Sequence, residues 1–264
     1  MRITVFGATG PTGRQLTDQA LAAGHQVTAV ARRPDLVTAR PGLTVLGADA
    51  TDAEAVDAAV AGRDAVLSAL GAAPGRREIT VYSQGTRNIL AAMRRHGAER
   101  LVVVSSSVLD PAWRPSGAFF FNRVLDPYVN RVIARTAHND MRRMEALVRD
   151  SGLAWTIARP SGLFDHPVVT DYRVAPDSAD GVFTARSDLA AAMLRTLAED
   201  RFVRSAMGVV TKDVEPGIPR LIWNEAVRKK RWSAPPVDDV RGVHRRRLFA
   251  SRQYDDQSSR RGRG

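Results

Sequence analysis

The chain has 264 residues, of which 44% are hydrophobic and 25% charged, a balance typical of a single globular domain. It contains no cysteine, which excludes disulfide bonds, thiolate metal ligands and a cysteine nucleophile. Most of the formal net charge of +11 lies in the last fifth of the chain. Arg and Lys outnumber Asp and Glu by 25 to 21 over residues 1–210, a net charge of +4, and by 14 to 7 over residues 211–264, a net charge of +7. We expect a cytoplasmic protein, because no apolar run is long enough for a secretion signal or a membrane span.

Apolar runs and helical periodicities alternate along most of the chain. Strands are predicted at residues 3–6, 26–30, 43–46, 65–70, 101–104 and 155–158. Helices are predicted at residues 14–23, 52–59, 81–95, 141–148 and 187–197, the second of them capped by Thr51. This alternation, with the unbroken apolar run at 101–104, predicts an α/β fold: a Rossmann-type doubly wound parallel sheet in a single domain over residues 1–210.

Three stretches fall outside this alternation. Residues 111–139 contain Trp113, Phe119, Phe120, Phe121 and Tyr128 and are interpreted as a substrate-side insertion. Residues 211–231 are predicted to form a helical extension, with a helix starting at Arg220. Residues 232–264 are predicted to be a basic, disordered tail. Because aspartates are interspersed among its arginines, we expect no specific nucleic-acid partner. We also expect no membrane partner, and a monomer or homodimer.

A glycine-rich loop follows the first predicted strand and opens the first predicted helix. Its sequence, Gly-Ala-Thr-Gly-Pro-Thr-Gly, spaces three glycines by three residues each. The first glycine permits a tight turn, the second permits a pyrophosphate to approach the backbone, and the third permits close helix–strand packing. The helix N-terminus adds free N–H groups for an anion. The loop therefore predicts a dinucleotide site formed by Gly7, Thr9, Gly10, Pro11, Thr12 and Gly13.

The ends of the next strands extend this predicted site. Dehydrogenases that prefer NAD carry an acidic residue after the second strand, whereas this chain has Arg32 and Arg33 there. Two guanidinium groups suit a 2′-phosphate, so the sequence predicts NADP (NADPH) as the cofactor. Asp49 and Ala50 end the third strand, where Asp49 could contact adenine or cap the next helix. Ala69, Leu70 and Gly71 end the fourth strand, where small residues would let the cofactor's ribose lie close to the backbone. A tight turn would explain Gly71 equally well.

Together with residues 103–107 and 153–160, these motifs resemble the atypical short-chain dehydrogenase/reductases over about residues 1–210. Within that group the chain is similar to NAD(P)H-binding proteins related to flavin reductase/biliverdin reductase B and to the regulator NmrA. The resemblance implies that Ser105, Ser106, Pro160 and Ser161 face the nicotinamide. Serines after a strand also cap the following segment, and this alternative stays open.

The chain departs from the typical short-chain dehydrogenases in its catalytic residues. Those enzymes carry Tyr-x-x-x-Lys after the fifth strand, whereas the only lysines here are Lys212, Lys229 and Lys230. The remaining candidates for proton donation are Ser105, Tyr128 and His138, the last interpreted as preceding a helix. Glu145 is expected to pair with Arg142 or Arg149. The aromatic residues of 111–139 could stack on a planar substrate or pack in the core, and the lone His166 predicts no metal site.

Two functions are compatible with these residues, and a third is less so. The first is an NADPH-dependent reductase of a small planar or quinone-like substrate, which takes its proton from solvent or His138. The second is a non-catalytic, NmrA-like regulator that senses the dinucleotide. A sugar-nucleotide epimerase is disfavoured, because the sequence shows no acid–base pair for that reaction.

Overall fold

The computed structural model describes residues 1–72, 78–115, 135–212 and 214. They belong to one compact unit, Met1–Gly217. The predicted extension at 211–231, apart from its first residues, and the predicted tail at 232–264 lie outside the described residues, as do Phe119, Phe120, Phe121 and Tyr128. Within the described part, no helix is long and apolar enough to cross a membrane.

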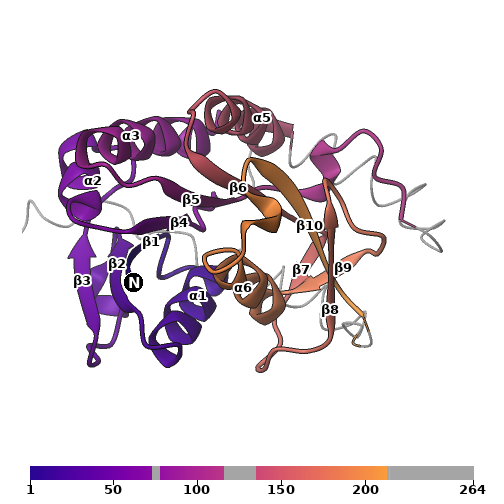
Figure 1. Cartoon of the computed structure of the whole chain (residues 1–264), viewed down its shortest axis with the longest axis horizontal. Coiled ribbons are helices and arrows are strands. Elements are labelled where there is room, and N and C mark those ends of the chain that lie inside the picture. Colours follow the sequence, from indigo (N-terminus) through magenta and orange to yellow (C-terminus); the bar gives the residue numbers. More distant parts are fainter. Residues whose placement is uncertain (73–77, 116–134, 213, 215–264) are drawn as a thin grey trace, which may run out of the picture. The chain divides into compact units, whose positions relative to one another are not determined.

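Eight strands form one sheet in the order β3-β2-β1-β4-β5-β6-β10-β8 (Figure 1). Neighbouring strands are parallel, except that β8 runs antiparallel to β10. The strands are β1 (Arg2–Phe6), β2 (Gln26–Ala31), β3 (Leu43–Gly47), β4 (Ala65–Ser68), β5 (Arg100–Val104), β6 (Ala154–Pro160), β8 (Tyr172–Pro176) and β10 (Ser205–Thr211). The strand order reverses between β1 and β4, which is where open α/β sheets bind ligands. The predicted Rossmann-type fold is confirmed.

Helices cover both faces of this sheet (Figure 1). On one face lie α2 (Ala53–Val60), α3 (Val81–His96) and α5 (Arg135–Arg149), and on the other lie α1 (Pro11–Ala22) and α6 (Arg186–Arg195). Two hydrophobic cores result. Val56, Ile89 and Met144 are buried in the first, and Leu16 and Met193 in the second. Because the cores fill both faces, a ligand has access to the sheet only along its edges and strand ends.

Local sequence explains where individual helices begin and end. Helix α1 begins with Pro11, whose fixed φ suits the first helical position. Helix α3 ends at His96 and is followed by Gly97, which adopts a left-handed conformation with φ of 69°. Helix α2 is capped by Asp52, whose carboxylate accepts from the N–H groups of Glu54 and Ala55. The predicted cap, Thr51, was wrong by one residue.

The C-terminal part of the described chain holds the elements that the periodicity did not predict. Strand β10 adds to the sheet beside β6, and β8 forms its edge. A second, two-stranded parallel sheet pairs β7 (Gly162–Phe164) with β9 (Phe183–Ala185). Helix α5 begins at Arg135, six residues before the predicted start, and therefore contains His138, which was wrongly placed before the helix.

Candidate dinucleotide-binding site and adjoining polar network

The loop between β1 and α1 turns so tightly that two of its glycines admit no side chain. Gly7 has a φ of +76°, and a Cβ there would lie 2.4 Å from the carbonyl oxygen of Ala69. A Cβ on Gly13 would lie 2.1 Å from the carbonyl oxygen of Gly7. These contacts are with backbone, which cannot move aside. The loop is therefore held against both its own helix and the loop that follows β4.

The N-terminus of α1 is left open by its own side chains. Gly10 is the N-cap residue, so no side chain caps the helix, and the first turn contains no acidic residue. Pro11 has no N–H group, while the N–H groups of Thr12 and Gly13 have no acceptor within the first turn. An uncapped helix start with its partial positive charge fits the pyrophosphate of a dinucleotide.

The loop after β4 lies beside this helix start. The N–H group of Ala69 donates to the carbonyl oxygen of Phe6 over 3.0 Å, and the hydroxyl of Tyr82 accepts from the N–H group of Ala72 over 3.1 Å. Gly71 is different from Gly7 and Gly13, because a Cβ there would meet nothing within 4 Å and its φ lies outside the left-handed region. The fold itself therefore does not require glycine at position 71.

The ends of β2 and β3 bring charged side chains together at the surface. Arg32 and Arg33 follow β2 directly and are exposed, and neither guanidinium group forms a hydrogen bond or ion pair with the side chains or backbone of the described residues. Asp49 accepts from both the N–H group and the hydroxyl of Thr51, over 2.9 Å and 2.7 Å. The backbone hydrogen bond from Thr51 and, more weakly, the charge of Arg32 hold the pKa of Asp49 below its usual value. Arg32 and Arg33 thus offer two exposed guanidinium groups that have no ion-pair partner among the described residues.

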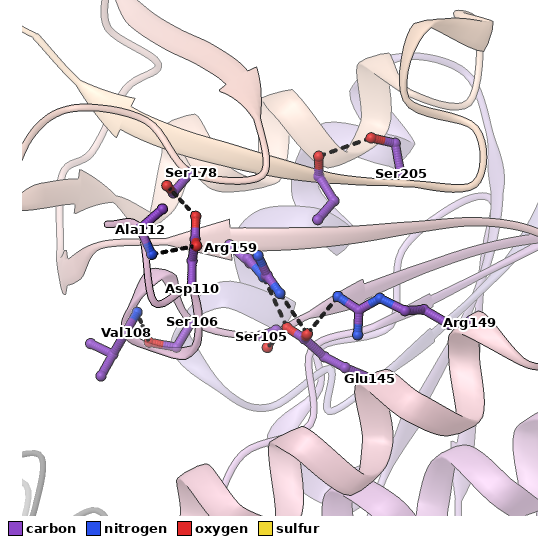
Figure 2. A network of polar contacts seen from close by, with 11 residues as sticks. Ser105, Ser106, Val108, Asp110, Ala112, Glu145, Arg149, Arg159, Ser178 and Ser205 are labelled. Carbon is purple, nitrogen blue, oxygen red and sulfur yellow. Dashed lines mark hydrogen bonds and ion pairs between the residues drawn. The ribbon is translucent and has the colours of Figure 1, made fainter. Parts of the chain in front are cut away.

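A buried ionic network lies at the carboxyl ends of β5 and β6 (Figure 2). Its centre is the carboxylate of Glu145, which projects from α5 toward the sheet. Arg159 on β6 donates to both carboxylate oxygens, over 3.0 Å from Nε and 2.7 Å from Nη2. The hydroxyl of Ser105, directly after β5, donates to Oε1 over 2.7 Å. Arg149, one turn further along α5, donates to Oε2 over 2.8 Å.

Three members of the network are buried, and its central pair is ionised. The relative exposure of Glu145 and of Ser105 is 3%, and that of Arg159 is 6%. Burial by itself raises the pKa of Glu145, but the hydrogen bonds from Arg159 and Ser105, together with the charge of Arg159, outweigh it and hold that pKa below its ordinary value. Burial likewise lowers the pKa of Arg159, and the contact with Glu145 reverses this, so that the net shift is upward.

The comparisons with known proteins agree with this geometry. A family described as NAD(P)H-binding matches residues 7–200. The chain belongs to this family. An uncharacterised chloroplast protein of Arabidopsis thaliana is 31% identical over 188 residues, which cover 67% of this chain and 64% of the plant protein. An uncharacterised protein of Bacillus subtilis is 28% identical over 62% of this chain and 74% of its own length. The chain thus spans less than two thirds of the plant relative.

Solved structures share the fold of this NAD(P)H-binding protein. A wide-type short-chain dehydrogenase/reductase from Veillonella parvula in complex with NADP is 20% identical and has a TM-score of 0.66, covering 80% of this chain and 95% of its own. The anaerobilin reductase ChuY from Escherichia coli is 24% identical and has a TM-score of 0.65, and the match covers 82% of this chain and 100% of ChuY. At these identities the likeness concerns the fold.

The serines expected near the nicotinamide have different partners in this NAD(P)H-binding protein. Ser106 caps the short turn Ser107–Leu109, its hydroxyl accepting from Val108 over 3.4 Å. Ser161, directly after Pro160 at the end of β6, donates to the carbonyl oxygen of Gly181 over 2.9 Å. Of these three serines, Ser105 alone hydrogen-bonds to an ionised side chain among the described residues, the carboxylate of Glu145. Ser105 was identified from its place after β5, whereas Glu145 and Arg159 were not predicted to be its partners.

Three further predictions have different outcomes. Of the two roles left open for Trp113, core packing is the one that the structure supports, because Trp113 is buried and its Nε1 donates to the carbonyl oxygen of Ala179 over 3.2 Å. Glu145 pairs with Arg149 as expected, while Arg142 instead donates to Asn139 over 3.2 Å. Tyr128 lies outside the described residues.

Proposed function

We propose that the protein is an NADPH-dependent oxidoreductase that reduces a small planar or quinone-like molecule. Membership of the NAD(P)H-binding family and the open, uncapped start of α1 support dinucleotide binding. A structural neighbour that is named a reductase of anaerobilin, and another in complex with NADP, are consistent with a reductase role. The observation that carries the choice of NADPH is the pair of exposed, unpaired arginines after β2.

Each part of the cofactor has proposed contacts in this chain. The pyrophosphate would lie on the N–H groups at the start of α1, with Gly10 admitting its close approach. Arg32 and Arg33 would bind the 2′-phosphate through forked hydrogen bonds. Adenine would lie near Asp49 and Ala50, and the ribose beside the loop from Ala69 to Gly71. The nicotinamide would lie near Ser105, Ser106, Pro160 and Ser161.

The proposed reduction needs little acid–base chemistry from the protein. When bound, NADPH supplies a hydride, and the substrate takes a proton from solvent or from His138. The substrate is thereby reduced by two electrons and two protons. Helix α5 follows β5 and contains neither tyrosine nor lysine, so it lacks the Tyr-x-x-x-Lys pair of typical short-chain dehydrogenases. The residues would instead bind and orient the two reactants.

The cofactor assignment is tested by Arg32→Ala combined with Arg33→Ala. Each charge-assisted hydrogen bond contributes about 1.5–3 kcal/mol, so losing two should weaken NADPH binding roughly 100-fold or more. NADH lacks the 2′-phosphate and should bind the variant and the wild type equally. Arg40→Ala is the matched control, because Arg40 is an exposed arginine that pairs with Asp18. An equal loss of NADPH and NADH affinity in calorimetry would overturn the 2′-phosphate assignment.

One observation favours a second function, a dinucleotide-sensing regulator without turnover. The hydroxyl of Ser105, a candidate proton donor, already donates to Glu145. NADPH oxidation measured across flavins, quinones and tetrapyrroles separates the two functions. Turnover of any acceptor supports the reductase, whereas tight NADPH binding without turnover supports the regulator.

A further inference from the structure

The Glu145 carboxylate determines which way the Ser105 hydroxyl points. A carboxylate can only accept hydrogen bonds, so the single hydroxyl hydrogen of Ser105 must lie along the 2.7 Å contact to Oε1. The backbone N–H group of Ser105 is also committed, since it donates to the carbonyl oxygen of Ala158 over 2.7 Å. What remains on the Ser105 side chain is its pair of oxygen lone pairs.

This arrangement is held rigidly from several elements. Four hydrogen bonds reach the carboxylate from Ser105, Arg159 and Arg149, which come from the end of β5, from β6 and from α5. If Ser105 turned its hydrogen toward a ligand, a buried carboxylate oxygen would lose a donor, which is unfavourable. Ser105 is therefore a poor proton donor and a well-oriented acceptor.

Ser105 lies where a ligand could use its hydroxyl oxygen as an acceptor. It directly follows β5, which pairs with β4 on one side and β6 on the other, and ligands of open α/β sheets bind beyond the carboxyl ends of such strands. A ligand group that meets only lone pairs must bring its own hydrogen. Quinone oxygens offer none, whereas amide and ring N–H groups do.

We propose that Glu145 is a positioning residue that fixes Ser105 as a hydrogen-bond acceptor, so that the site takes a ligand carrying an N–H donor. This inference rests on the proposed oxidoreductase function. Two ligands could supply the N–H group: the carboxamide of the nicotinamide, or the ring of a planar substrate such as a flavin or a tetrapyrrole. The assignment also explains why the proton for reduction must come from elsewhere than Ser105.

The test compares ligand pairs that differ only in the N–H group. The first pair is NADP+ and its acetylpyridine analogue, in which a methyl group replaces the amide nitrogen. The second pair is a flavin and the same flavin methylated at its ring N–H. Calorimetry gives the affinity of the wild type for the first pair, and flavin titration in the presence of NADP+ gives it for the second. We expect a roughly two- to tenfold preference for the N–H form in one pair, the contribution of one neutral hydrogen bond.

Ser105→Ala removes the acceptor and should abolish that preference. It leaves Glu145 with its two arginine partners, so the network keeps its charge balance. Ser107→Ala is the matched control, because Ser107 is also buried and its hydroxyl donates to the carbonyl oxygen of Arg159 over 2.9 Å instead of to Glu145. Glu145→Gln should also reduce the preference, since a glutamine amide can donate to the Ser105 oxygen and occupy its lone pairs.

The outcomes are separable. Loss of the preference in the first pair identifies the cofactor carboxamide as the donor, and loss in the second identifies the substrate ring. A merely structural role would weaken both members of a pair alike and leave their ratio unchanged. If NADP+ binds but neither pair shows a preference that Ser105→Ala removes, the inference is overturned and the proposed function stands. If neither NADP+ nor NADPH binds the wild type, both the inference and the proposed function are overturned.

Discussion

The Glu145–Arg159 pair lends itself to a quantitative test of stability. The side chains are 5% and 8% exposed, so Glu145→Gln would leave the charge of Arg159 buried without its counter-ion. Breaking a buried pair in this way costs about 3–5 kcal/mol, a large share of the 5–15 kcal/mol typical of a folded domain. At roughly 2–4 °C per kcal/mol for a domain of this size, Tm should fall by about 6–20 °C.

Two further variants show whether the buried charge is the cause. Arg149→Gln removes the partly exposed partner, whose side chain is 42% exposed, and should cost no more than about 1 kcal/mol. Arg159→Met added to Glu145→Gln removes the unpaired charge and should recover about half of the loss. Thermal and urea unfolding followed by circular dichroism measure all three. A Glu145→Gln loss as small as that of Arg149→Gln, with no recovery in the double variant, would refute the reasoning.

Three other predictions concern two glycine substitutions and the effect of acid on stability. Gly13→Ala should destabilise the protein by about 2–4 kcal/mol, because its Cβ would meet backbone at 2.1 Å. Gly71→Ala should change stability by less than about 0.5 kcal/mol, since its Cβ meets nothing within 4 Å, yet weaken NADPH binding in calorimetry; unchanged affinity would place the cofactor elsewhere. Because the pKa of Glu145 is lower in the folded chain, the unfolded chain binds more protons in acid. The free energy of unfolding in urea should therefore fall as pH drops below about 4.5, and less steeply in Glu145→Gln; equal slopes would contradict this.

The N-terminal two thirds of the fold could be predicted because their strands are continuous apolar runs between amphipathic helices. Strand β10 lacks that signal, since its sequence, SAMGVVT, places a glycine at its centre. The structure shows why: a Cβ on Gly208 would lie 2.1 Å from the backbone nitrogen of Ala179, so another segment crosses the strand there. Glycine in a strand marks such a close approach, but periodicity does not say which segment approaches.

The candidate site could also be predicted only in part. The glycine loop and Arg32 with Arg33 are local patterns, readable wherever a strand is followed by a helix. The Ser105–Glu145–Arg159 network joins residues 40 and 14 positions apart, which no local pattern reports. A signal for it was nevertheless present, because Glu145 lies on the inward side of α5 beside Met144, and Arg159 lies in a strand whose last six residues are all buried. A charged side chain in either place requires hydrogen-bonding or charged partners, which the sequence pattern does not identify.

Stability alone does not account for the ions at this position. A buried ion pair contributes little more than well-packed apolar side chains of similar volume, because desolvation offsets the attraction between its charges. An apolar pair between α5 and β6 could hold these elements together equally well. It could not, however, orient the hydroxyl of Ser105, since that requires an acceptor that never donates. The presence of Glu145 and Arg159 beside Ser105 is therefore better explained by their effect on the Ser105 hydroxyl, which they hold as a hydrogen-bond acceptor, than by the packing they provide.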